Sequence, residues 1–429
     1  MSDLLQQLQN AAQQEDWPQI VQILQQLLWE DPSPAATLSE LYLPPALAVL
    51  SAGDFTARWD IARLFPQLGE AAIAPLVALL QDADQDLEAR WFATRILGQF
   101  RQSAAIVALT QVVQSNEVEE LTEMATEALA GLGADAIAAL TNLLPNPATR
   151  RLAVQALAQI HHAETVEPLL QVVADADATI RTLALEALSS FADVRIPPLL
   201  VQALTDPSAQ VRQAAVSGLA TRPEWSEALN LPELLADRLW DIDPTVCQAA
   251  AASLGRLAMP TATDTLFRGL TAPQTSVSLQ LAIVRALGWT GSKTALDYLS
   301  RWLLETDQAD AAVQREVIGI LGRWADPSLK WLASRPLIQM LEQAAVGHLD
   351  LKPEIALALG QLGQPEALEP LISLLANPDI GVRLHAIAAL KQIDRPTAYD
   401  QLTTLVHQPA LPDTLRQGIE FALQEWSLN

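Results

Sequence analysis

Apolar residues recur at helical spacing in short paired segments along most of this 429-residue chain. In one pair, the first segment spans residues 197–205, opens with two prolines and then carries leucines at helical spacing. Asp206-Pro207 ends this segment, because the residue before a proline disfavours helical backbone. A second apolar pattern of the same period spans 211–219. The pattern predicts two helices joined by a tight turn.

The same unit recurs twelve times, with Arg or a substitute in the first turn of the second helix and Leu, once Phe, seven residues later. Successive units start 28 to 38 residues apart and average about 32.5 residues, the length of a two-helix repeat. In several units a Gly follows the repeated Leu, where a small residue lets two helices approach closely or ends a helix. The twelve pairs are Arg58/Phe65, Arg90/Leu97, Thr122/Leu129, Arg150/Leu157, Arg181/Leu188, Arg212/Leu219, Cys247/Leu254, Gln280/Leu287, Gln314/Leu321, Lys352/Leu359, Arg383/Leu390 and Arg416/Leu423.

The repeat predicts an all-α fold in which about twelve helix pairs stack into a solenoid over residues 41–429. Residues 1–40 do not fit the repeat, and we expect them to form an N-terminal helical cap. A hydrophobic content of 50% with only 5% aromatic residues suits small side chains packed between closely stacked helices. Because stacked helix pairs form long binding surfaces far more often than catalytic pockets, the repeat favours a binding protein.

The turn sequences resemble those of HEAT repeats, specifically the short variety called PBS-lyase HEAT-like repeats. The resemblance rests on residues 206–212, Asp-Pro-Ser-Ala-Gln-Val-Arg, and 377–383, Asn-Pro-Asp-Ile-Gly-Val-Arg, each followed by an Ala-rich helix. By the repeat count it covers roughly residues 40 to 426. It implies a right-handed α-solenoid, an α-α superhelix, similar to the E/F-type phycobilin lyase subunits of cyanobacteria, which handle open-chain tetrapyrroles and phycobiliproteins.

In four units an Asp or Asn stands six residues before the recurrent Arg. The resemblance implies that this pairing forms a ladder linking neighbouring turns. The planar fork of guanidinium donors also suits carboxylates and free carbonyl oxygens at helix ends. We therefore interpret these residues as structural. The ladder residues are Asp84 with Arg90, Asp175 with Arg181, Asp206 with Arg212, and Asn377 with Arg383.

The residues one, five and nine positions after the ladder residue share one face of the second helix. The core face is next to it and carries the residue one position before the ladder residue and those three and seven positions after it. We expect this face to be exposed and, by the resemblance, to line the concave side. Across the twelve units it carries seven Arg and four Glu, a net positive stripe in a protein of formal charge -24. Trp and Arg often dominate binding energy. We predict protein binding by Trp59, Arg63, Trp91, Arg95, Arg151, Arg256, Arg285, Trp289, Arg315 and Arg323.

Charge and cysteine content further limit the functions and the compartment that we expect for this protein. Fifty acidic residues against 26 basic ones repel phosphate backbones, which disfavours general nucleic-acid binding. The single cysteine, Cys247, excludes an intrachain disulfide and is compatible with a reducing compartment. The first residues lack a basic and apolar leader, and no segment reaches the roughly 18 apolar residues of a membrane helix. We expect a cytoplasmic protein.

The sequence is poor in catalytic and metal-binding motifs. Five histidines are scattered and none stands next to Glu, so the iron-binding His-Glu pairs of the HEAT-like deoxyhypusine hydroxylases are missing. Walker A, G-x-S-x-G and G-x-G-x-x-G segments do not occur. We expect no metal and no catalytic residue, and any enzymatic activity would be the phycobilin lyase activity that the resemblance implies.

Three functions follow as hypotheses. The preferred one is a protein-binding scaffold or assembly factor, related by the resemblance to phycobilisomes and photosynthesis, whose partner is a phycobiliprotein or a second HEAT subunit. The second is a bilin lyase or bilin chaperone, in which guanidinium groups pair with the two propionates of a bilin and its rings stack on indole. The third, a nucleic-acid-binding HEAT protein of the glycosylase type, needs a broadly cationic groove that this acidic chain lacks.

Overall fold

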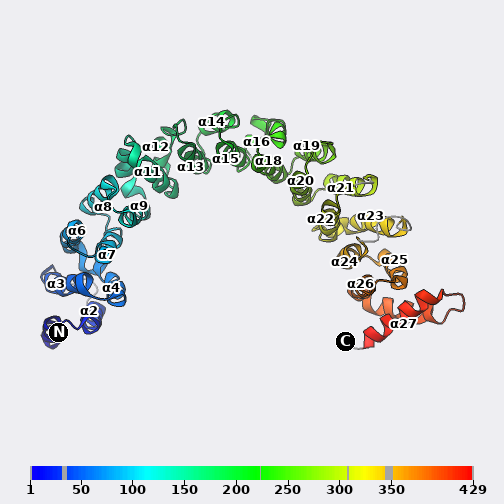
Figure 1. The fold of residues 1–429 in the computed structure, drawn as a ribbon, viewed down its shortest axis with the longest axis horizontal. Helices are drawn as coiled ribbons and strands as arrows, with labels where there is room; N and C mark the ends of the chain where they lie inside the picture. The colour runs from blue at the N-terminus through cyan, green and yellow to red at the C-terminus, as the bar shows by residue number, and fades with distance from the viewer. Residues whose placement is uncertain (1, 31–35, 223, 307–308, 344–350, 428–429) are drawn as a thin grey trace. The chain divides into compact units, whose positions relative to one another are not determined.

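The computed structural model describes residues 2–30, 36–222, 224–306, 309–343 and 351–427, and every element in these ranges is an α-helix or a short 3-10 helix. The chain forms two compact units, residues 1–199 and 200–429, whose boundary lies within α14 (Ile196–Ala203). In each unit the helices form two rows, seen in Figure 1. We call the first helix of each pair an A helix and the second a B helix.

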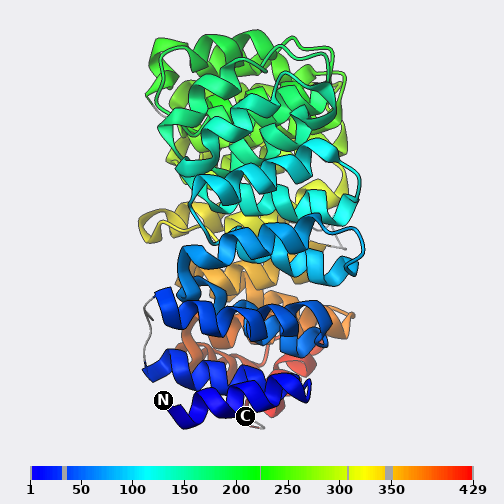
Figure 2. The same cartoon turned by 90° about the vertical axis from the view of Figure 1, so that its left-hand side faces the viewer.

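In the first unit, each A helix packs against the B helix that follows it, and α3, α6, α8 and α10 also pack in succession along their row. Figure 2 shows the helices of this unit stacked side by side in chain order. Two helices precede the rows, α1 (Ser2–Gln13) and α2 (Trp17–Glu30). The A helices are α3 (Ala36–Ala52), α6 (Ile73–Gln81), α8 (Ser103–Ser115), α10 (Ile137–Leu143) and α12 (Val166–Leu170), and the B helices are α4 (Phe55–Ala62), α7 (Leu87–Leu97), α9 (Glu119–Gly131), α11 (Pro147–Gln159) and α13 (Ala178–Leu188).

The second unit repeats this arrangement, with contacts along each row and between the rows. The short helix α16 (Trp225–Ala228) precedes α17. Its A helices are α17 (Leu231–Ala236), α19 (Pro260–Thr271), α21 (Lys293–Glu305), α23 (Lys330–Gln343) and α25 (Leu368–Ser373), and its B helices are α15 (Ala209–Leu219), α18 (Pro244–Leu257), α20 (Val277–Thr290), α22 (Ala311–Gly322), α24 (Lys352–Leu362), α26 (Ile380–Val406) and α27 (Asp413–Ser427).

The prediction of an all-α fold built from stacked helix pairs is confirmed for the described residues. The predicted boundary between a cap at 1–40 and repeats from 41 falls inside α3, which begins at Ala36, and residues 31–35 lie outside the described residues. No single helix in the described ranges is long and apolar enough to cross a membrane. The pair Phe55–Ala62 and Phe65–Gln81, bent by 47°, meets that test by length and composition only.

The start of each B helix explains why the repeated residue is so regular. In eleven of the twelve units the ladder residue is the fourth residue of its helix, and Lys352 is the first residue of α24. A polar residue commonly precedes the helix, and its side chain accepts a hydrogen bond from a backbone N–H of the first turn, which satisfies one of the unpaired donors there. Such caps are Asp54, Asp86, Asn146, Asp177, Asp243, Ser276, Asp310 and Asp379.

Two B helices depart from the simple pattern because of proline. In the first repeat, α4 ends at Ala62 and Phe65 begins the separate helix α5 (Phe65–Leu68). Pro66 has no N–H to continue the helical hydrogen bonds, so the break follows. In the last third of the chain, α26 is kinked at Asp394, whose φ is -157° and ψ is 93°, two residues before Pro396. The segment after the kink therefore serves as the A helix that precedes α27.

The ladder arginines hold together the turn between the A and B helices of their own repeat. Arg212 donates from Nη1 to the carbonyl oxygens of Asp206 at 2.8 Å and Pro207 at 3.1 Å. Arg150, Arg181 and Arg383 donate to the carbonyl oxygens five and six residues before them in the same way. Arg90 instead donates from Nε to the carbonyl of Leu80, and the backbone N–H of Asp84 bonds to the side chain of Asp82.

Carboxylates that pair with these arginines come from the following repeat. Arg212 holds Asp241, 29 residues ahead, through two bonds of 2.7 and 2.8 Å. Arg150 reaches Asp175 at 2.8 Å and Arg58 reaches Asp86 at 2.6 Å. Asp175 therefore gives its carbonyl to Arg181 of its own repeat and its carboxylate to Arg150 of the preceding one.

Candidate protein-binding surface

The predicted Trp and Arg residues of the first two B helices lie together. Helices α4 and α7 are in contact, and each carries a Trp one residue and an Arg five residues after its ladder position. The guanidinium carbon of Arg95 is 4.2 Å from the centre of the Trp59 ring and 5.7 Å from that of Trp91. Arg63 lies over the Trp59 ring at 5.6 Å. These are cation–π distances, so the two helices share one network.

Phenylalanine side chains extend this network toward the core. Phe55 stacks on Trp59 with ring centres 6.0 Å apart, and it is 55% exposed. Both indoles make edge contacts with the buried ring of Phe92. Phe55 was not predicted from the sequence, although it lies three residues before the ladder residue and one helical turn before Trp59. We call Phe55, Trp59, Arg63, Trp91 and Arg95 the N-terminal Arg/Trp cluster.

The charges of this cluster are not neutralised by the protein itself. Among the described residues, no carboxylate lies within ion-pair distance of Arg63 or Arg95. Arg63 is exposed and Arg95 is half-buried between the indoles. On the next B helix, α9, the same stripe carries the exposed acids Glu123 and Glu127. The cationic surface is therefore confined to α4 and α7 and does not continue along the row.

A hollow lies beside the cluster at the end of α4. It has a volume of about 670 Å³ and is lined by Gln25, Leu28, Trp29, Leu64 and Gln67. Trp29, at the end of α2, is 87% exposed, an unusual position for so large an apolar side chain. Leu64 directly follows Arg63, so the hollow adjoins the turn that follows α4.

Arg285 and Arg315, which were also predicted to bind protein, are arranged differently. Arg285 on α20 donates from Nε to Glu316 on α22 at 2.8 Å, and Arg315 on α22 donates to Glu354 on α24 at 3.1 Å. The hydrogen bond to Glu316 raises the pKa of Arg285. These two arginines join successive B helices, so reversing either one to Glu would set two carboxylates against each other. This pairing makes them poor probes of partner binding.

The other four predicted residues make no ring contact or ion pair with one another among the described residues. Trp289 is 64% exposed at the end of α20. The guanidinium group of Arg323 lies about 3.5 Å from where a side chain on Gly319 would begin. Arg256 approaches the Ser253 hydroxyl at 3.4 Å, and Arg151 is exposed on α11.

The groups that carry catalytic or metal chemistry elsewhere are dispersed here. In the part of the chain that the structure describes, no three His, Cys, Asp or Glu side chains gather into a group that could hold a metal ion. The Cys247 thiol is buried, and this burial raises its pKa, which disfavours the nucleophilic thiolate.

Comparison with known proteins bears on the fold and the family. A family model of HEAT repeats matches residues 43–130, 137–220, 232–310 and 334–424. Among curated proteins, none matches the sequence. Importin beta is similar in structure, with a TM-score of 0.52 at 14% identity over 98% of this chain. Kap121p gives 0.52 at 15% identity over 90% of this chain.

The chain spans 64% of the length of that importin beta and 50% of that Kap121p chain. At such low identity the likeness concerns the fold alone, and both structures are solenoid neighbours of this one. The family model, in contrast, covers well over half of the sequence. Its matches follow the helix pairs described above and run through both units. The chain belongs to the HEAT-repeat family.

Proposed function

We propose that this protein is a binding scaffold or assembly factor that captures another protein through the N-terminal Arg/Trp cluster. The observation that carries the proposal is the pair of guanidinium groups, Arg63 and Arg95, held against half-buried indoles without a carboxylate partner among the described residues. Arginines that serve the fold, such as Arg212 and Arg285, do have such partners. An unpaired and pre-positioned Arg on an aromatic surface is typical of a binding hot spot.

The same surface indicates the chemistry of the partner. Arg63 and Arg95 would pair with carboxylates, and the hollow beside Trp29 would receive an apolar side chain. Holding Arg95 between two rings lowers the entropy that it loses on binding. The partner is therefore a protein that presents an acidic segment with an apolar anchor.

The resemblance to PBS-lyase HEAT-like repeats supports a more specific proposal, in which the partner is a phycobiliprotein or a second HEAT subunit, met in the cytoplasm as part of phycobilisome assembly. A bilin is the alternative occupant. The cluster fits one chemically, because Arg63 and Arg95 would hold its two propionates while Trp59 and Trp91 offer faces to its rings. A bilin would be the chromophore of the complex, and these four side chains would bind and orient it.

Mixing the purified protein with a free bilin distinguishes the two occupants. We expect little change in the visible absorbance, because an exposed surface cluster does not enclose a ligand of that size. Adding a candidate HEAT subunit tests whether a second chain completes a tighter site. A saturable sharpening and shift of the absorbance with the chain alone, lost in a Trp59→Ala variant, would instead favour the bilin chaperone.

Truncating the two indoles tests the proposed binding surface. We expect the double variant Trp59→Ala, Trp91→Ala to weaken partner capture by about 2 kcal/mol or more, roughly a thirty-fold rise in Kd, since both anchors and the support of Arg95 are lost. The measurement is capture from native extract followed by mass spectrometry, and then titration against the partner that is identified. Circular dichroism and thermal unfolding check that the repeats stay folded.

A matched control comes from another exposed Trp with its own Arg. Trp331 on α23, an A helix, lies 5.9 Å from the Arg335 guanidinium and outside the stripe. Trp331→Ala should leave capture unchanged, as should charge reversal at the exposed acids Glu117 and Glu119. The same partners captured by the double variant with equal affinity, or lost with Trp331→Ala, would contradict the proposed surface.

A further inference from the structure

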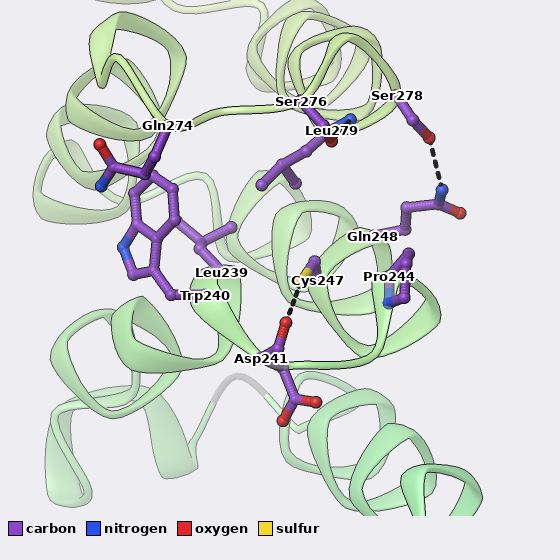
Figure 3. A pocket seen from close by; sticks show the side chains of 10 residues that line it. All are labelled: Leu239, Trp240, Asp241, Pro244, Cys247, Gln248, Gln274, Ser276, Ser278 and Leu279. Atoms are coloured by element: carbon purple, nitrogen blue, oxygen red, sulfur yellow. Dashed lines mark hydrogen bonds between the residues drawn. The ribbon is translucent and has the colours of Figure 1, made fainter.

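The joint between the repeats that contain α18 and α20 has a cavity of about 400 Å³. Figure 3 shows Cys247 at its floor, between the turn that carries Asp241 and the turn that carries Ser276. Trp240 and Gln274 lie along one side, and a hydrogen bond of 2.9 Å from Gln248 to Ser278 closes the other. The volume lies within the range of about 300–1,000 Å³ that small-ligand sites occupy.

The cavity occupies the place that an arginine side chain fills in other repeats. Cys247 is the fourth residue of α18, the ladder position, where a side chain long enough to bridge two turns is replaced by a short thiol. Its Sγ donates to the carbonyl oxygen of Asp241, six residues earlier, at 3.1 Å. In Arg212, by comparison, the guanidinium group bonds to the equivalent carbonyl, that of Asp206, and also reaches the next repeat.

The groups around the cavity are hydrogen-bond acceptors and an aromatic face. The residue of the next repeat that corresponds to Asp241 is Gln274, which lines the cavity on the same side as Trp240. Trp240 is 43% exposed beside it and offers a ring for cation–π contact. Asp243 adds negative charge, whereas the Asp241 carboxylate is already paired with Arg212. The fields of both acids contribute, after burial, to the raised pKa of the Cys247 thiol. The surroundings favour a cation over an anion.

We propose that this cavity is a receptor for an arginine side chain presented by a partner polypeptide. The entering guanidinium group takes the place of the missing ladder arginine: it donates to the Asp241 carbonyl and the Gln274 carboxamide and lies against Trp240. An ammonium group lacks the planar fork that these acceptors match. The site lies in the second unit and does not depend on the N-terminal Arg/Trp cluster, so the two proposals fail or succeed separately.

The direct test uses N-acetyl-arginine amide as the probe. Its binding is followed by the indole N–H signal of Trp240 in the NMR spectrum, which is identified by its loss in Trp240→Phe. We expect a saturable shift, with at least ten-fold weaker binding of N-acetyl-lysine amide and of the uncharged citrulline analogue. The blocked peptide Gly-Arg-Gly should bind at least as well as the amide, because a protein partner would present its arginine in that form.

Two substitutions change the cavity in opposite directions. Cys247→Arg fills it with the protein's own guanidinium group, so probe binding should fall at least ten-fold while the melting temperature rises. Gln274→Glu adds the carboxylate that other repeats place opposite their arginine, so binding should tighten roughly ten-fold.

Several results would overturn the proposal. One is that binding of N-acetyl-arginine amide does not saturate at millimolar concentration, and another is that the lysine and arginine amides bind equally well. The proposal also fails if the amide binds but the Gly-Arg-Gly peptide does not, or if a folded Cys247→Arg variant still binds the amide. Should Cys247→Arg fail to fold, Gln274→Glu decides alone, and unchanged or weaker binding there refutes the guanidinium site. The Trp59→Ala, Trp91→Ala protein should bind the probe normally.

Discussion

Replacing Arg212 with alanine is expected to lower the free energy of unfolding of the repeats around α15 and α18 by about 3 to 5 kcal/mol. The Asp241 side chain is only 3% exposed, and both of its oxygens accept hydrogen bonds from Arg212. Without the guanidinium group, this carboxylate stays buried with Arg238 at 3.9 Å as its remaining cationic neighbour. The carbonyls of Asp206 and Pro207 lose a donor as well.

Hydrogen exchange is the appropriate measurement, because solenoid stability is a sum of local terms and opening is local. Amides of α15 and α18 should lose protection in Arg212→Ala. Arg195→Ala is the matched control: this arginine also binds two carboxylates, Glu167 and Asp193, but it is half exposed and solvent screens the pair. Equal loss of protection in the two variants would contradict the argument from burial.

The same joint should weaken in acid. The hydrogen bond from Arg212 lowers the pKa of Asp241 in the folded state, against an opposing effect of burial. A carboxyl whose pKa is lower folded than unfolded stabilises the fold at pH above its unfolded pKa of about 3.9, and this stabilisation is lost as pH falls through the folded value. The difference in stability between the natural protein and Arg212→Ala should therefore shrink as the pH falls below about 4.

Adding one methyl group at Gly322 is expected to destabilise the protein by about 3 kcal/mol, even though alanine is the better helix former. A Cβ at this position would lie 2.7 Å from both Cα and Cβ of Ala358 on the next B helix. Backbone cannot rotate away as a long side chain does, so α22 and α24 would have to separate. Gly255 and Gly360 meet the backbone of Ala286 and Ala389 at similar distances.

Gly131→Ala provides the control with the opposite sign. Gly131 ends α9, and a Cβ there would have no heavy atom within 4 Å. Alanine should be neutral or stabilise by up to about 1 kcal/mol, because it restricts the unfolded chain. Urea unfolding of both variants, read by circular dichroism, gives the comparison. Effects of the same sign and size at the two sites would show that helix propensity, and not the close approach of α22 and α24, governs these glycines.

The sequence by itself determined the repeat, because its signals are local. The period of apolar residues, the capping residue and the ladder residue all act within one helical turn, and eleven of the twelve ladder residues begin their helices at the same fourth position. The glycines after the repeated Leu marked where helices pack closely, as Gly322 and Gly360 do. The same local pattern placed Trp59 and Trp91 at equivalent positions on two adjacent helices.

Only the tertiary structure decided what each side chain meets. Arg212 pairs with Asp241, 29 residues away, because packing of successive repeats brings that carboxylate to its fork. Arg95 and Arg285 occupy the same place in the repeat, yet one lies between indoles and the other holds Glu316, since the neighbouring helix presents different groups. The cavity beside Cys247 has the same cause. The Cys247 side chain is too short to fill the space between the turns of two successive repeats, and the packed helices keep those turns apart.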